Sequence, residues 1–284
     1  MNFKKLVIAS TLGCAAISFP LFLAACGDDD SDFIARPDGA KSSSSMARNY
    51  SSTTEPYTIV DQFNPKISYG EMVDDRDGQT YRTVKIGDQT WMAENLNYRD
   101  LRKVWDYDSS SFCYNDSAIY CERYGRFYPW STAMDSIGTW STNGKGCGGN
   151  GCTPTYPVRG ICPSGWHLPD STEWRILINT AGGDSIAGEH LKSRSPDWET
   201  QVNYDDKKRY GGKDTYGFSA LASGTYWDIR VGVACIPRLS TEIWTSTSYY
   251  STDAYAIHLD IFNNNAWYYT PEKRSSNPVR CVKD

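Results

Sequence analysis

Alternation of apolar and polar residues predicts a β-hairpin at the start of the globular part of the chain. Residues 81–86 alternate in character, which places Val84 and Ile86 on the same face of a strand. Gly87-Asp88 is typical of a two-residue turn, and Thr90-Trp91-Met92 supplies the second strand. The pattern therefore predicts two antiparallel neighbours with one buried face.

A short acidic segment just upstream, Asp75-Arg76-Asp77-Gly78, invites comparison with a calcium-binding loop. With Asp77 and Gly78 at loop positions five and six, positions one and twelve fall on Val73 and Val84. Both positions need carboxylates. We therefore expect an ordinary turn here and no metal site.

The clearest helix start in the chain lies at residues 168–174. Asp170 is placed to accept hydrogen bonds from the first free amides, and Glu173 is placed to reach back to the start, which is a capping box. Trp174, Leu177 and Ile178 then share one face, and Gly182-Gly183 ends the helix. Capping explains Glu173 better than a role as a catalytic acid.

The remaining pattern predicts an α+β domain. Residues 98–157 are rich in loop formers, with one short helix near 130–136, and a second helix is expected at 185–192. Later strands are expected at 218–222, 243–248, 255–262, 266–269 and 279–282, with a turn at 263–265. Strands at both ends of the domain are expected to pair with each other.

The first 25 residues have the layout of an export signal. Lys4 and Lys5 precede an uncharged apolar run of residues 6–25, which is long enough to span a bilayer as a retained anchor. However, Leu23-Ala24-Ala25-Cys26 resembles the bacterial lipobox, in which the cysteine after the cleavage site receives a diacylglycerol. We expect Cys14 to be removed with the leader and Cys26 to carry lipid that anchors the protein to a membrane.

Residues 26–56 are expected to form an unfolded tether. Asp28, Asp29, Asp30 and Asp32 repel one another in water, and the serine-rich stretch that follows has too few apolar residues to form a core. Acidic residues after a lipidated cysteine also resemble the surface-sorting signal of some Gram-negative lipoproteins. The expectation is an outer-membrane lipoprotein, on the cell surface or on the periplasmic face. Residues 57–284 then form one domain, large enough for a real core.

Charge and composition narrow the class of partner. Removal of Lys4 and Lys5 with the leader leaves 27 basic and 34 acidic residues, a net charge of −7. Nucleic-acid binding calls for a clustered basic face, so we expect none. The 20 tyrosines and 10 tryptophans suit a core with few aliphatic residues, and aromatic rings also form stacking platforms for sugars.

Seven cysteines fall in the expected domain, and an exported protein is expected to oxidise them. Spacing alone leaves 105 ways to form three bridges with one cysteine unpaired, although Cys113–Cys121 and Cys147–Cys152 are locally plausible pairs. A zinc site is the alternative. The three histidines stand at no zinc-like spacing from a cysteine pair, so neither a metal nor another cofactor is expected.

Five blocks of sequence are ordered over about 210 residues. The blocks are Asp77-Gly78-Gln79-Thr80-Tyr81, Trp91-Met92-Ala93-Glu94-Asn95-Leu96-Asn97, Tyr124-Gly125-Arg126-Phe127-Tyr128-Pro129-Trp130, Cys162-Pro163-Ser164-Gly165-Trp166-His167-Leu168-Pro169 and Val279-Arg280-Cys281. Together they resemble the Fibrobacter succinogenes major paralogous domain, and the resemblance implies a lipidated surface protein of unestablished biochemical role.

A smaller set of motifs consists of Leu168-Pro169, Glu173-Trp174, Gly217-Phe218-Ser219-Ala220 and Arg280-Cys281. More distantly, these motifs resemble formylglycine-generating-enzyme and C-type-lectin-like domains. The resemblance implies a C-type-lectin-like domain with two helices, antiparallel strands and disulfide-stapled loops. It also implies a Cys162–Cys281 bridge, which leaves Cys235 over as a small buried hydrophobe rather than a reactive thiol.

Enzymatic activity of the formylglycine-generating type is disfavoured. That chemistry needs two cysteines in a pocket shortly before the closing Arg-Cys, and residues 236–280 contain none. No serine motif or facing carboxylate pair supplies another mechanism, so no catalytic residue is assigned. Calcium-dependent sugar binding is also unsupported, because Glu55-Pro56-Tyr57 falls in the tether and no Trp-Asn-Asp occurs.

Binding through aromatic residues is the function that we expect. The candidate ligand contacts on polysaccharide are Trp227, Tyr249, Tyr250, Trp267 and Tyr268, although packing in the core is an alternative role for each. The expected order is a surface binding module for polysaccharide or envelope partners first, an envelope structural protein second and an enzyme third.

Overall fold

The structure is a computed structural model that describes residues 62–103, 110–149, 151–199, 202–203, 205–228, 233–235 and 239–284. These residues belong to one compact unit, Tyr57–Asp284. The leader, the acylation of Cys26 and the tether that the sequence predicts all fall outside the described residues. Within the described part of the chain, no helix has the length and apolar character needed to cross a bilayer.

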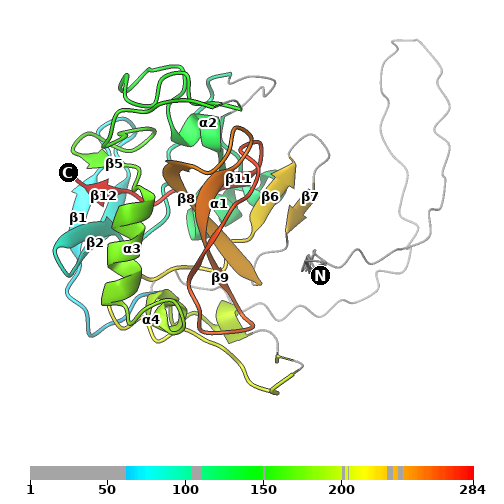
Figure 1. Ribbon diagram of the computed structural model, residues 1–284. Coiled ribbons are helices and arrows are strands. Elements are labelled where there is room, and N and C mark those ends of the chain that lie inside the picture. Colours follow the sequence, from blue (N-terminus) through cyan, green and yellow to red (C-terminus); the bar gives the residue numbers. More distant parts are fainter. Residues whose placement is uncertain are drawn as a thin grey trace, which may run out of the picture. The chain divides into compact units, whose positions relative to one another are not determined.

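The first sheet joins the beginning and the end of the described chain (Figure 1). Its order is β1-β2-β3-β12-β5 and every pairing is antiparallel. The expected pairing of the two ends is confirmed, because Val282 lies opposite Trp91 on one side and His167 on the other. The strands are β1 (Gly70–Val73), β2 (Thr80–Ile86), β3 (Gln89–Met92), β5 (Trp166–His167) and β12 (Val282–Lys283).

The expected hairpin and the turn before it are both present. Strands β2 and β3 pair from Thr83 opposite Met92 to Ile86 opposite Gln89, and Gly87 turns the chain with a φ of 59°. That backbone conformation suits glycine, which has no Cβ to clash. Val84 and Ile86 are buried. The segment read as a turn rather than a calcium loop closes with a hydrogen bond from Gly78 N to Asp74 O.

Two further antiparallel sheets complete the β-structure. One has the order β10-β9-β8 and the other β4-β11-β6-β7. The strands expected at 243–248, 255–262 and 266–269 are confirmed within one to three residues, whereas β6 and β7 were not expected from the pattern. The strands are β4 (Tyr128–Pro129), β6 (Thr225–Asp228), β7 (Val233–Cys235), β8 (Ser240–Ser248), β9 (Ala254–Asp260), β10 (Trp267–Tyr269) and β11 (Ser276–Asn277).

The helices confirm the local signals and correct the expected number. Helix α3 (Ser171–Thr180) begins with the full capping box, in which the Asp170 side chain accepts from Thr172 N and Glu173 N, and Asp170 N donates to Glu173. Helices α2 (Trp130–Ala133) and α4 (Ala187–Leu191) lie inside the ranges expected for short helices.

Helix α1 (Ala118–Tyr124) was not expected: the pattern predicted three helices and the more distant resemblance implied two, whereas the described residues form four α-helices. Ser117 at its start makes no side-chain capping bond, which leaves no local signal for the pattern to show. Short 3₁₀ turns lie at Tyr114–Asp116 and Pro196–Glu199. The helix is held by long-range contacts, including the Arg123 side chain 2.5 Å from Asp197. It is tertiary structure that stabilises α1.

The strand expected at 218–222 does not form. In the described chain this segment contributes one isolated bridge, Lys192 to Ala220, and Ser219 has a φ of 54°. Ser219 is held there because its N–H donates to Asp214 Oδ1 at 2.7 Å and its carbonyl accepts from Arg280. Polar bonds to distant residues replace a strand ladder. The strand expected at 279–282 is likewise shortened, since β12 begins only at Val282.

The main core lies between the first sheet and the β8–β9 ribbon, with α3 packed into it (Figure 1). Trp174 of α3 is fully buried and contacts Trp91 at 4.8 Å and Phe218 at 5.8 Å between ring centroids. A second core cluster contains Trp130 and Trp244, whose indole N–H groups donate to backbone carbonyls. Buried indole rings thus contribute to the apolar packing of both clusters.

Three disulfide bonds staple the loops. Cys113–Cys121 and Cys147–Cys152 close the short loops expected from spacing, and Cys162–Cys281 is the pair that the more distant resemblance implied. The last bridge connects residues 119 positions apart and fixes the segment before β5 to the segment before β12. The fold is therefore α+β, with few helices, antiparallel sheets and disulfide-stapled loops.

Candidate functional site

Three of the five aromatic candidates contribute to one cluster of tyrosines. Tyr249 contacts Tyr250 at 4.1 Å and Tyr255 at 5.0 Å between ring centroids, and Tyr255 contacts Tyr268 at 5.6 Å. Tyr249 and Tyr250 are exposed by 42% and 63%, while Tyr255 and Tyr268 are half-buried. We call these four residues the tyrosine row.

Strand register explains why these rings meet. Tyr268 of β10 lies opposite Ile257 of β9, and Tyr255 lies two residues before Ile257, so all three side chains share one face of the sheet. Ile257 is buried in the main core, so this face of the sheet is the one that points toward the core. Tyr255 was not among the sequence candidates, although its period-two spacing from Ile257 was a usable signal.

The first turns of α3 form the other wall of a groove beside the tyrosine row. Ser171, Thr172 and Arg175 line it opposite Tyr255 and Tyr268, and its volume is about 450 Å³. The Tyr268 hydroxyl donates to Ser171 O, which positions the ring against the helix. Burial raises the pKa of the Tyr268 phenol, so the ring stays neutral at physiological pH.

Arg175 covers one face of Tyr268 and was missed by the sequence reasoning. Its guanidinium lies 4.7 Å from the Tyr268 ring centroid and also pairs with Asp184. A guanidinium over an aromatic ring is attracted by the ring electrons while its N–H groups stay available at the edge. The groove therefore combines apolar ring faces with polar donors at its rim.

Trp267 does not contribute to the tyrosine row. Trp267 lies opposite His258 on the other face of the same strands and stacks on its imidazole, with ring centroids 4.7 Å apart. Trp227 belongs to β6, and its side chain lies outside the described part of the structure. Adjacent residues of a strand face opposite ways, so Trp267 and Tyr268 cannot belong to one platform.

Beside Trp267 lies a histidine between two carboxylates. His258 Nδ1 is 3.4 Å from Glu242 Oε1 and its Nε2 is 3.6 Å from Asp260 Oδ2. Burial alone would lower the pKa of His258, but Asp260 and Glu242 raise it to about 9. The imidazolium therefore lies between two largely buried carboxyl groups inside the sheet, and its single positive charge is shared between them.

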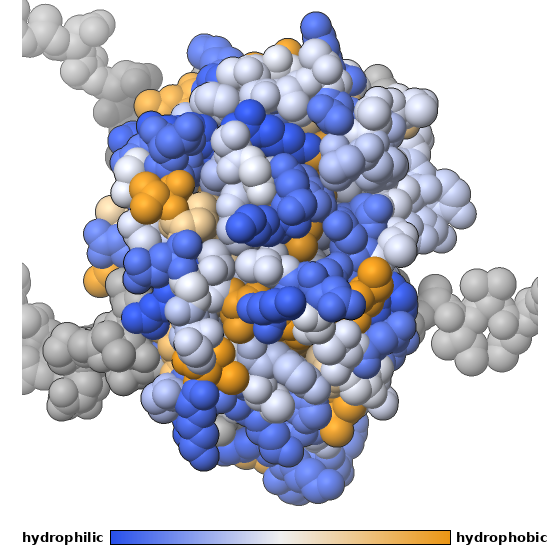
Figure 2. Space-filling model, turned by 90° about the vertical axis from the view of Figure 1, so that its left-hand side faces the viewer, coloured by the Kyte–Doolittle hydropathy of each residue, from blue (hydrophilic) through white to orange (hydrophobic). Residues whose placement is uncertain are grey.

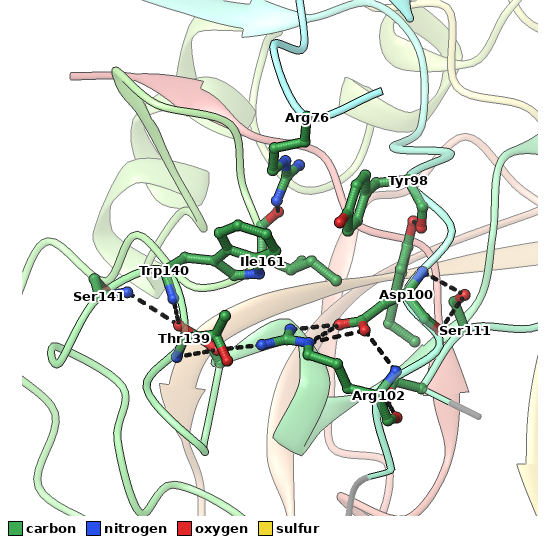
Figure 3. A network of polar contacts seen from close by, with 12 residues as sticks. Arg76, Tyr98, Asp100, Arg102, Ser111, Thr139, Trp140, Ser141 and Ile161 are labelled. Carbon is green, nitrogen blue, oxygen red and sulfur yellow. Dashed lines mark hydrogen bonds and ion pairs between the residues drawn. The ribbon is translucent and has the colours of Figure 1, made fainter. Parts of the chain in front are cut away.

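A further polar network, drawn in Figure 3, orders the loops around Trp140. Arg76 lies 4.0 Å from the Tyr98 centroid and 5.1 Å from the Trp140 centroid, and Arg102 lies 5.2 Å from Trp140. Arg76 pairs with Asp74, while Arg102 pairs with Asp100 and Asp135. Because each of these charged groups is paired within the network, the network connects the loops that carry them.

No metal centre is found in the part of the chain that the structure describes. There, no three His, Cys, Asp or Glu side chains gather closely enough to hold a metal ion.

The face shown in Figure 2 is mainly hydrophilic, with apolar residues in small separate patches. Large apolar docking areas are therefore lacking on that face.

Comparison with known proteins identifies the family. The model of the Fibrobacter succinogenes major domain matches residues 84–283, which is most of the chain. The chain belongs to this family. No curated protein and no solved structure matches it. The Fibrobacter succinogenes major domain here begins within β2 and ends with β12, so the groove and all three disulfide bonds fall inside it.

Proposed function

We propose that this protein is an exported, lipid-anchored binding module that holds a single polysaccharide chain in the groove beside the tyrosine row. The observation that carries the proposal is the continuous run of ring contacts from Tyr250 to Tyr268, partly exposed and facing Arg175. Cys26 supplies the anchor, and the acidic tether holds the domain away from an outer-membrane surface. The domain does no chemistry on its ligand.

The angles between the rings favour one type of polysaccharide ligand. Successive ring planes in the tyrosine row are inclined by 60°, 61° and 77°. A flat crystalline surface needs rings in one plane, whereas inclined rings along a groove contact a single chain from different sides. We therefore propose soluble glycan chains as the ligand, in preference to crystalline cellulose.

We also propose that the domain has the C-type-lectin-like arrangement. Its support is the pairing of β12 with β3 together with the Cys162–Cys281 bridge, which bring the two ends of the domain side by side. In this arrangement long loops carry binding surfaces on a stapled scaffold. The tyrosine row includes such a loop, because Tyr249 and Tyr250 follow the end of β8.

The proposal is tested by measuring affinity for soluble xylan and soluble β-glucan in affinity electrophoresis, beside pull-down on insoluble cellulose. The mature chain would be produced in an oxidising compartment so that the three disulfides form. Each aromatic contact contributes about 0.5–1.5 kcal/mol, so Tyr250→Ala and Tyr268→Ala are each expected to weaken binding roughly two- to tenfold.

Trp267→Ala is the matched control, because this residue neighbours Tyr268 in sequence but lies on the opposite face of β10. Equal losses in Trp267→Ala and Tyr268→Ala would argue against the groove. Retention on envelope fractions with no affinity for any glycan would instead support the envelope structural role.

A further inference from the structure

A second hollow, independent of the tyrosine row, lies where four distant parts of the chain meet. It has a volume of about 250 Å³ and shares no lining residue with the groove. Small-molecule pockets typically measure about 300–1,000 Å³, so this one suits a single small molecule rather than a polymer. We call it the polar pocket.

Blocks of sequence that carry the family resemblance converge on the polar pocket. Eight of its thirteen lining residues belong to four of the five blocks, although the blocks lie up to about 200 residues apart in the chain. The eight are Gln79, Thr80, Tyr81, Glu94, Asn95, Asn97, Gly125 and Arg280.

Hydrogen bonds between these blocks make the walls rigid. The Arg280 guanidinium is fully buried and donates through Nε to Asn95 Oδ1 at 2.8 Å. Asn95 in turn donates to Tyr124 O at 2.8 Å, and Tyr81 accepts from Asn97 N at 3.0 Å. A pocket whose walls are bonded to one another loses little entropy when a ligand enters.

Hydrogen-bond acceptors remain available on these walls. Glu94 accepts from Arg82 N through one carboxylate oxygen at 2.6 Å, and burial raises the pKa of this carboxyl. Asn97 Oδ1 is buried and accepts no hydrogen bond from any residue that the structure describes. A buried acceptor without a donor is costly, so a ligand that brings donors is favoured here.

The charges that line the polar pocket are of both signs. Glu94 and Glu122 stand beside Arg123 and Arg280. An anionic ligand would meet two carboxylates, and a cationic ligand would meet two guanidinium groups. A neutral ligand that both donates and accepts hydrogen bonds avoids both penalties.

We propose that the polar pocket binds one neutral, polyhydroxylated unit of monosaccharide size, with Glu94 and Asn97 as acceptors for its hydroxyl groups. The unit is either a free sugar or the terminal unit of a glycan. The polar pocket shares no lining residue with the groove beside the tyrosine row, so this proposal does not depend on the proposal for the groove.

The test is saturation-transfer NMR on the full-length chain in detergent. The probes are D-glucose, D-xylose and D-galactose for free sugars, and cellotetraose and xylotetraose for chain ends. We expect Glu94→Gln, which keeps the side-chain shape, to weaken affinity at least tenfold. Glu122→Trp, at an exposed position of the pocket lining, is expected to block entry without disturbing the core.

Two control variants locate the effect. Glu71→Gln changes an exposed carboxylate on β1 outside the polar pocket, and Tyr268→Ala changes the groove, so both are expected to keep the signal. Saturation of free sugars identifies a free ligand, and saturation confined to terminal units of the oligosaccharides identifies a chain end. No saturation of any probe overturns the proposal, as does binding that survives Glu122→Trp.

Discussion

His167 Nδ1 lies 2.7 Å from Asp284 Oδ1, and this contact ties β5 to the residue that follows β12. The other ring nitrogen, Nε2, lies 2.8 Å from Glu173 Oε1. Glu173 also accepts from Asp170 N in the capping box. One imidazole thus couples the first sheet to the start of α3, the helix that packs into the main core.

This coupling predicts a dependence of stability on pH. Burial alone would lower the pKa of His167, but its bonds to Glu173 and Asp284 raise that pKa above 6.5. The stabilisation is therefore complete below pH 6.5 and is lost as pH rises through the folded-state pKa. We expect His167→Gln to lower the free energy of unfolding by about 1 kcal/mol at pH 5.5 and by less at pH 9, where the imidazole has lost its charge. The effect at pH 5.5 is small because solvent screens the ion pair with exposed Asp284.

Urea unfolding of the oxidised protein at the two pH values measures this difference. Asp284→Asn is the partner control and is expected to produce a smaller effect of the same sign. A loss that is equal at both pH values would show that His167 stabilises through packing alone.

His258 predicts a second, larger transition at higher pH. With the pKa raised to about 9, its charge stabilises the fold fully below pH 6.5, and this stabilisation is lost between pH 6.5 and 9. We expect the free energy of unfolding to fall on the order of 3 kcal/mol across that window, because each pKa unit corresponds to about 1.4 kcal/mol. In His258→Gln the fall is expected to be largely absent, and a full decline in that variant would contradict the assignment.

The disulfides are expected to differ in what they contribute. In the chain-entropy model, the Cys162–Cys281 bridge, which spans 119 residues, stabilises by about 5 kcal/mol, whereas Cys147–Cys152, which spans five, stabilises by about 2 kcal/mol. Replacement of each pair by alanine, followed by urea unfolding, compares them directly. Similar losses for the two pairs would point to local packing and not to loop closure.

Local signals in the sequence were sufficient for some elements. Asp170 and Glu173 predicted the start of α3 because a capping box involves residues three apart. Gly87-Asp88 predicted the hairpin because a two-residue turn is also a local signal. Elements that depend on partners far away in the sequence were not predicted. Helix α1 is held by the contact of Arg123 with Asp197, and the segment at 218–222 is held by hydrogen bonds from Arg280.

The candidate site shows the same division. Tyr249, Tyr250 and Tyr268 were recognised by residue type, but Trp267 was grouped with Tyr268 although strand alternation separates neighbouring residues. Arg175 could not be found from the sequence, because only the packing of α3 against β10 brings it over Tyr268. The polar pocket required four blocks to be placed in space before Glu94, Asn97 and Arg280 could be seen together.

Arg280 provides a test of how much the fold depends on one buried guanidinium. It donates to Asn95 Oδ1, Phe218 O and Ser219 O and lies 4.4 Å from the Phe218 ring centroid. A lysine has one compact ammonium group and cannot reach these separate acceptors. We expect Arg280→Lys to lower the free energy of unfolding by about 2–4 kcal/mol, because carbonyl groups would be left buried without donors. Arg175→Lys, at an exposed ion pair, is the matched control and is expected to change it by less than about 0.5 kcal/mol. If urea unfolding gives equal values for the two variants, the guanidinium geometry does not hold residues 218–219 in place.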